Sequence, residues 1–93
     1  MKKTFALSHP KLAPARLVDS IKHEVKKYIK RERNKQLPTG VDYWDFDCKY
    51  GKNEQEAQVV HMTELNKCID TAAKDERESV YLEILVKEGV RGE

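Results

Sequence analysis

The sequence lacks any hydrophobic run long enough to cross a membrane, and the short apolar segment near its start, Phe5-Ala6-Leu7, is too brief for the core of a signal peptide. Cysteine is scarce as well: Cys48 and Cys68 are the two present, and their spacing fits neither a zinc site nor a redox motif. We therefore expect a cytoplasmic protein with two reduced thiols and no membrane contact.

Glycine and proline are also few, at four and three of the 93 residues, and no repeat or low-complexity linker divides the chain. Hydrophobic residues make up 39% of the sequence and charged residues 37%. This balance is typical of a folded protein with a heavily charged surface, not of a disordered one. The length predicts a single domain over residues 1–93 with a modest core.

Motifs for catalysis, cofactors or metals are missing. Asp45 and Asp47 would share one face of a strand, but the same alternation turns Asp42 away from them, which disfavours a metal site. Cys48 and His61 are the one pair that could act as nucleophile and base, yet Cys48 is expected to face inward, where a thiol is inert. The sequence thus predicts no catalytic, cofactor-binding or metal residues, and a protein that binds without catalysing a reaction.

The longest predicted element is an amphipathic helix over Pro14–Gln36. Val18, Ile21, Val25 and Ile29 recur at helical spacing and form one apolar stripe. Proline is favoured in a first helical turn, where its missing N–H has no intrahelical partner. The residues after Ile29 offer no apolar side chain to hold the last turns against a core, so we expect this basic end of the helix to project into water.

Three segments alternate apolar and polar residues as strands do, namely Lys3–Ser8, Val41–Tyr50 and Ser79–Lys87. The segment between the last two is ambiguous. Asn53 and Glu56 resemble a helix-capping pair that would begin one long helix over 54–74. Alternatively, residues 57–62 form a strand and Thr63 caps a shorter helix over 64–74, an interpretation that the paired valines favour.

The favoured element order is therefore β-α-β-β-α-β, the split pattern of ferredoxin-like folds. It predicts an α+β two-layer sandwich in which two helices cover one face of an antiparallel sheet. The alternative is β-α-β-α-β with a long second helix.

Charge is distributed unevenly along the chain. Residues 1–40 carry eleven basic and three acidic side chains, a net charge of +8, whereas residues 41–93 carry seven and thirteen, a net charge of −6. A basic face of this kind attracts polyanions by electrostatic steering and counterion release.

The basic side chains concentrate on the second half of the long helix. As candidate polyanion-binding residues we identify Lys22, Lys26, Lys27, Lys30, Arg31, Arg33 and Lys35. The partner that they favour is RNA or DNA, bound through its phosphates. Two alternatives stay open: an ordinary solvated helix face, and a protein-interaction module or homodimer in which this helix of one chain meets the acidic sheet edge of another.

Tyr43 and Tyr81 could stack bases on the open face of the sheet, as aromatic residues do in ferredoxin-like RNA-binding domains. Asp45, Asp47 and Glu83 share that face and would repel phosphates. Ordinary pairing across the strands is therefore the better interpretation of the two tyrosines.

The segments Lys2–Lys11, Lys22–Tyr28 and Trp44–Lys49 resemble those of a family of short uncharacterised bacterial proteins of about this length. The resemblance extends over nearly the whole chain. It implies a bacterial, cytoplasmic protein of unknown function, and it assigns no site residues.

Overall fold

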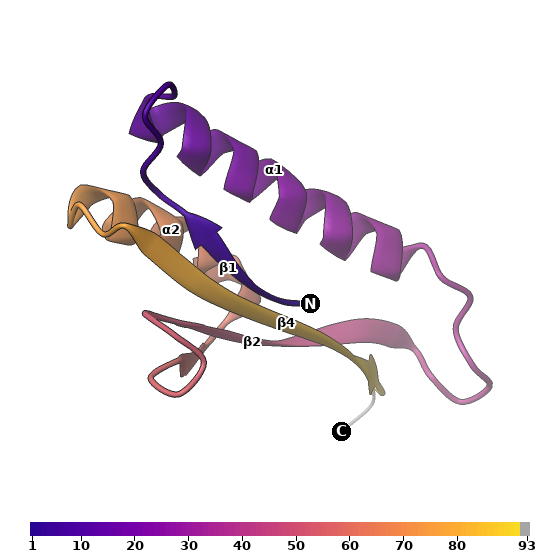
Figure 1. Cartoon of the computed structure of the whole chain (residues 1–93). Coiled ribbons are helices and arrows are strands. Elements are labelled where there is room, and N and C mark those ends of the chain that lie inside the picture. The colour runs from indigo at the N-terminus through magenta and orange to yellow at the C-terminus, as the bar shows by residue number, and fades with distance from the viewer. Residues whose placement is uncertain (92–93) are drawn as a thin grey trace.

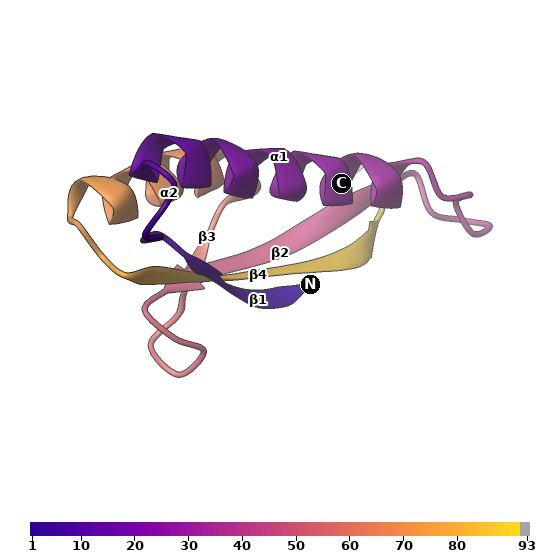
Figure 2. The ribbon, with the colours of Figure 1, turned by 45° about the horizontal axis from the view of Figure 1, so that its top comes forward.

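The computed structural model describes residues 1–91. In chain order the elements are β1 (Lys2–Ala6), α1 (Pro14–Arg33), β2 (Tyr43–Gly51), β3 (Gln58–Val60), the 3-10 turn η1 (Met62–Glu64), α2 (Leu65–Lys74) and β4 (Ser79–Gly89). The strands form one antiparallel sheet in the order β1-β4-β2-β3. Both helices cover one face of this sheet (Figure 1), and the loop between β2 and β3 extends from the opposite face (Figure 2).

The predicted class, an α+β two-layer sandwich with the order β-α-β-β-α-β, is confirmed. The central strands are β4 and β2, whereas a ferredoxin-like sheet has its first and third strands at the centre. β4 pairs with β1 along one edge and with β2 along the other. All five residues from Val80 to Ile84 are buried, so both faces of this part of the strand are covered.

The core lies between the sheet and the two helices. Its largest fully buried side chains include Leu65 and Ile69 of α2 and Leu82 and Ile84 of β4. From α1 the predicted stripe contributes Val18, Ile21 and Val25, and from β2 Phe46 and Cys48 face inward. Because this packing fixes α1 alongside α2, it also fixes which side of α1 faces its neighbour.

The segment before α2 confirms the strand interpretation and excludes the long helix over 54–74. Asn53 and Glu56 do contact each other, but within a turn: the backbone N–H of Glu56 donates to Asn53 Oδ1, as in a helix cap, and the side-chain amide of Asn53 donates to the Glu56 carboxylate. The prediction that Thr63 is the cap is wrong. The Nδ1 atom of His61 instead accepts a hydrogen bond from the backbone N–H of Thr63 at 3.2 Å and so begins η1, which leads into α2.

The helix α1 ends at Arg33, three residues before the predicted end. The cations of its last turn are exposed, as expected, but Glu32 is buried and the turn lies against β2. The indole N–H of Trp44 on β2 donates to the backbone carbonyl of Lys35 at 2.9 Å. The guanidinium of Arg33 lies 5.7 Å from the centre of the Phe46 ring, and Glu32 is only 7% exposed. Aromatic residues of β2 thus hold the basic end of α1 in place, although that end has no apolar residues of its own.

Candidate functional site

The helix α1 distributes the seven candidate cations over three places. The first set lines a groove between α1 and the η1–α2 segment. The second lies on the opposite flank of α1 beside β1, and the third is a single residue two positions past the end of the helix. The groove set is Lys22, Lys26, Lys30 and Arg33; the flank set is Lys27 and Arg31; the remaining residue is Lys35. The groove therefore collects four of the seven predicted residues.

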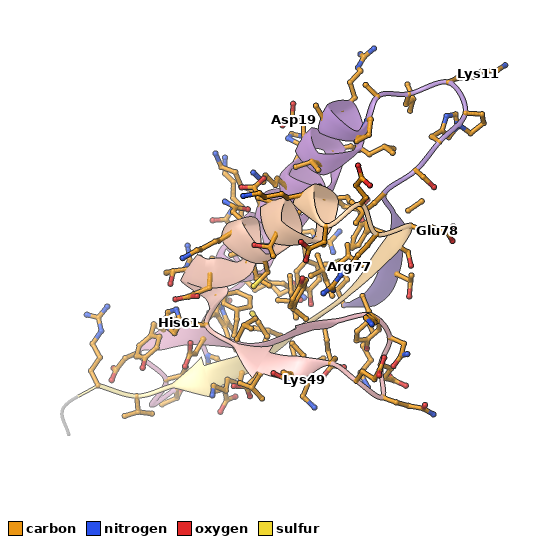
Figure 3. All side chains as sticks on the ribbon, turned by 90° about the vertical axis from the view of Figure 1, so that its left-hand side faces the viewer. Lys11, Asp19, Lys49, His61, Arg77 and Glu78 are labelled. Atoms are coloured by element: carbon orange, nitrogen blue, oxygen red, sulfur yellow. The ribbon has the colours of Figure 1, made fainter. Side chains whose placement is uncertain are left out.

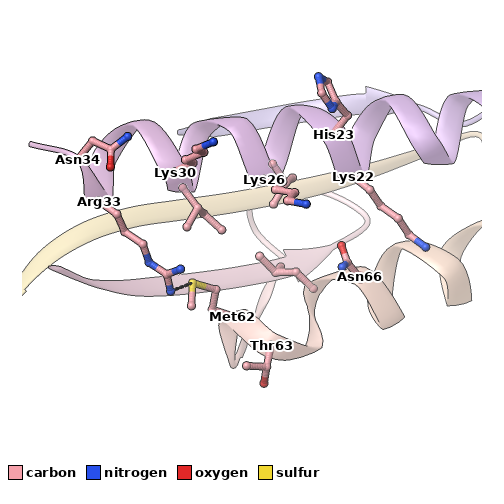
Figure 4. Close-up of a pocket in the computed structure, with 12 residues that line it drawn as sticks. Lys22, His23, Lys26, Lys30, Arg33, Asn34, Met62, Thr63 and Asn66 are labelled. Atoms are coloured by element: carbon pink, nitrogen blue, oxygen red, sulfur yellow. Dashed lines mark hydrogen bonds between the residues drawn. The ribbon is translucent and has the colours of Figure 1, made fainter. Parts of the chain in front are cut away.

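The groove has a volume of about 660 Å³. Its α1 wall is cationic, because residues four apart on a helix lie one above the other. Its floor is apolar and includes Val25, Ile29 and Leu65. The opposite wall carries no charge and is formed by Met62, Thr63 and Asn66 (Figure 4). Met62 is partly buried against the core and so continues the apolar floor.

Each end of the groove is closed by a cation of α1 that reaches across to the other wall. At one end Lys22 forms an ion pair with Asp70 of α2, with 2.7 Å between Nζ and Oδ1. At the other end a guanidinium nitrogen of Arg33 lies 3.7 Å from the sulfur of Met62 (Figure 4). These contacts orient the two side chains and keep both cations at the groove.

Between these ends, Lys26 and Lys30 are exposed. Within residues 1–91, neither ammonium group has a carboxylate oxygen within 4.0 Å. One helical turn of about 5.4 Å separates successive positions on this wall. The middle of the groove thus presents two positive charges that the described part of the fold leaves unneutralised.

On the opposite flank of α1, Lys27 and Arg31 line a second hollow of about 490 Å³ together with Lys2 and Lys3 of β1. Part of this charge is used within the fold. The ammonium of Lys3 donates to Glu24 at 2.9 Å, and the guanidinium of Arg31 lies 5.5 Å from the centre of the Tyr28 ring. This flank is basic but partly neutralised.

Lys35 has a structural role. Its ammonium lies 2.6 Å from a carboxylate oxygen of Glu32, and this contact lowers the pKa of the Glu32 carboxyl. Since Glu32 is almost fully buried, its charge needs such a partner. We therefore separate Lys35 from the residues that are free to bind a ligand.

Tyr81 cannot stack a base on the outer sheet face, because it is only 5% exposed. Its hydroxyl donates to Glu83 at 2.8 Å and also contacts Glu54 of the β2–β3 loop at 3.3 Å. Burial is the main cause that raises the pKa of Tyr81. The tyrosine therefore packs within the fold and is not available to a base.

The two Asp residues of β2, and Asp42 just before it, are likewise engaged. Lys87 of β4 lies 2.7 Å from Asp47 and 3.8 Å from Asp45, and Asp42 accepts from the backbone N–H of Arg91 at 2.7 Å. Over residues 1–91, no three His, Cys, Asp or Glu side chains come together in a way that could hold a metal ion.

Cys48 is 1% exposed, and burial raises the pKa of its thiol to about 11, with Asp47 and Asp45 adding to the shift. The thiol therefore stays protonated at neutral pH, which is unfavourable for a nucleophile. The Nδ1 atom of His61 is hydrogen-bonded to Thr63, whose hydroxyl oxygen lies 2.8 Å away. Its place at the start of η1 is visible in Figure 3.

This burial predicts a large difference between the two thiols in reactivity. Near neutral pH we expect Cys48 to react with an aromatic disulfide reagent about 100-fold more slowly than an unperturbed thiol, because its thiolate fraction is lower by that order. The less buried Cys68 should react first. The measurement is the reaction time course of Cys68→Ser and Cys48→Ala, and rapid modification of Cys68→Ser would contradict the expected burial.

The neutral wall of the groove was not foreseen from the sequence. Met62, Thr63 and Asn66 carry no charge pattern, and they reach α1 only because α2 packs beside it. A helical period can predict which residues share a face of one helix, but not what a neighbouring element brings to that face.

Among residues 1–91, no helix is long and apolar enough to span a membrane. No curated protein and no solved structure matches the chain. One family does match it, over residues 1–93, and this agrees with the resemblance to short uncharacterised proteins. The chain thus belongs to DUF6172, a family of unknown function.

Proposed function

We propose that this protein binds a polyanion, with nucleic acid as the preferred class, through the groove wall formed by Lys22, Lys26, Lys30 and Arg33. The observation that carries the proposal is the pair Lys26 and Lys30, which are exposed, adjacent and without an acidic partner in the described residues. Flexible ammonium groups in a row are suited to phosphate oxygens, which hold a nucleic acid in place without reading its sequence.

The other candidate cations have lesser roles in this proposal. Lys27 and Arg31 lie on the far flank of α1, where they can add long-range attraction to a chain bound in the groove. Lys35 is committed to Glu32. We therefore expect substitutions at Lys27 and Arg31 to weaken binding less than substitutions at Lys26 and Lys30.

We also propose that the protein is bacterial and acts in the cytoplasm, as expected from the sequence. Two free thiols are typical of a reducing environment, in which nucleic acid is abundant.

A salt titration tests the proposal. Because Lys22 is paired with Asp70, we count three phosphate contacts, at Lys26, Lys30 and Arg33. They predict that affinity for a single strand falls with a slope of about −2 in a double logarithmic plot, or roughly 20-fold between about 50 and 200 mM salt. The measurement is fluorescence anisotropy with labelled oligonucleotides, with polyphosphate and polyglutamate as competitors. Salt-independent affinity, or no binding near about 100 mM salt, would contradict the proposal.

Self-association is a second candidate, in which the basic helix α1 of one molecule contacts the outer face of the sheet of another. The outer face of the sheet carries Leu85, which is 41% exposed, beside Asp45 and Asp47, both of which pair with Lys87. Lys49 lies on the same side, away from the helices (Figure 3). A basic helix against this face would be a head-to-tail contact, which forms rings or open chains of molecules. Light scattering would then show a mass that rises with concentration and falls with salt.

A further inference from the structure

The walls of the groove differ in chemistry. Cations stand on one side, Thr63 and Asn66 on the other, and the floor between them is formed by apolar side chains that include Ile29 and Met62. A ligand that has charged groups but no apolar group would leave this floor in contact with water. The groove therefore fits a ligand with anions along one edge and a flat or apolar group beside them.

We propose that the groove binds single-stranded nucleic acid, with the backbone along Lys26 and Lys30 and one unstacked base over Ile29 and Met62. This inference rests on the proposed function and names its ligand more narrowly. An unpaired base offers a π-face to an apolar floor and donor and acceptor groups at its edge, and the exposed amide of Asn66 can pair with either kind of group.

A duplex fits the same site less well. Its bases are stacked and paired inside, so only phosphates and sugars would reach the groove, and the floor would stay unused. The helix α1 is also not free to enter a major groove from this side. A helix with its side chains measures about 10–12 Å across, the width of that groove, and α2 lies directly beside α1.

The volume is consistent with this ligand. About 660 Å³ lies within the range of roughly 300 to 1,000 Å³ for sites that take small organic groups. The contacts of Lys22 with Asp70 and of Arg33 with Met62 limit the groove at its two ends. The floor between these ends accommodates a short stretch of the strand, and the rest of the strand would follow the surface of α1.

The test compares oligonucleotides that differ only in their bases. A single strand of roughly twelve nucleotides, its abasic counterpart of equal phosphate number and a duplex are titrated at one salt concentration, with RNA and DNA forms of each. We expect the abasic strand and the duplex to bind about tenfold more weakly than the single strand. The form that binds more tightly, RNA or DNA, then identifies which nucleic acid the groove prefers.

The variant Met62→Ala separates the role of the floor from that of the charge. We expect about a fivefold loss of affinity for the strand with bases and less than a twofold change for the abasic strand. Val59→Ala, at a side chain that is 77% exposed and outside the groove, is the matched control and should change neither. Ile29→Ala provides a second floor variant, should Met62→Ala disturb the position of Arg33.

Equal affinity for the strand with bases and the abasic strand would overturn this inference and leave the proposed function standing. Failure of every phosphate polymer to bind would overturn both. Tight binding of polyglutamate in place of the oligonucleotides would overturn this inference and the preference for nucleic acid in the proposed function, and would favour an acidic protein segment as the occupant of the groove.

Discussion

Reversing three charges in the groove, as Lys26→Glu, Lys30→Glu and Arg33→Glu, is expected to lower affinity for a single-stranded oligonucleotide by at least about 100-fold near 100 mM salt. Each lost phosphate contact removes about 0.7 counterions from the release that drives binding, which is about fivefold per contact at this salt concentration. Repulsion by the new carboxylates adds to the loss. Anisotropy titrations of the variant and the parent protein measure the effect directly.

A matched variant controls for net charge. Lys11→Glu, Lys52→Glu and Lys74→Glu change the total charge by the same amount at exposed positions outside the groove. We expect this control to lose no more than a few-fold in affinity, through long-range electrostatics alone. Because Arg33 also contacts Phe46, the circular dichroism spectrum of the groove variant must match that of the parent. Equal losses in the two triple variants would show that the groove is not the binding site.

Leu82→Ala should reduce the free energy of unfolding by about 2 to 5 kcal/mol, the usual cost of truncating a fully buried leucine. Leu82 is 0% exposed and lies on β4, the strand that pairs with both β1 and β2. A domain of this size has a total stability of about 5 to 15 kcal/mol, so the loss would be a large part of it. Urea unfolding, followed by the fluorescence of Trp44, measures the change.

Leu85→Ala provides the same chemical change on the same strand. Its side chain is 41% exposed on the face away from the helices, so little surface returns to water when it is truncated. We expect a loss below about 1 kcal/mol. Similar losses for the two variants would contradict the central position of β4 and the assignment of its inner face.

The elements with a clear period were predictable from the sequence. The stripe of Val18, Ile21 and Val25 predicts both the helix and its buried side, and the alternation in β4 predicts Leu82 and Ile84 as core residues. The last turn of α1 was not predictable in this way. It is held by Trp44 and Phe46, which come from a strand outside the helix and its periodic pattern.

The wrong prediction of Thr63 as a helix cap is explained by a local hydrogen bond. Thr63 has the side chain of a typical cap, but His61 lies two residues earlier and accepts the bond from the backbone of Thr63. Histidine is not among the residues usually expected at a cap, so propensity alone assigns the role to threonine.

For the groove, the sequence predicts one wall and not the other. The spacing of Lys22, Lys26 and Lys30 is enough to place them on one side of α1. The apolar floor and the neutral wall depend on the packing of α2 beside α1, which brings together residues that are far apart in the chain. The narrower proposal, a single strand with an unstacked base, therefore arises only from the structure.

The most direct test of the groove as the binding site is a ¹⁵N HSQC titration with a single-stranded oligonucleotide at low and near-physiological salt. We expect salt-sensitive shifts at Lys26, Lys30 and Arg33 and, across the groove, at Met62–Asn66, with the amides of Asp45–Asp47 unchanged. A spectrum without shifts, or shifts confined to the outer face of the sheet, would contradict it.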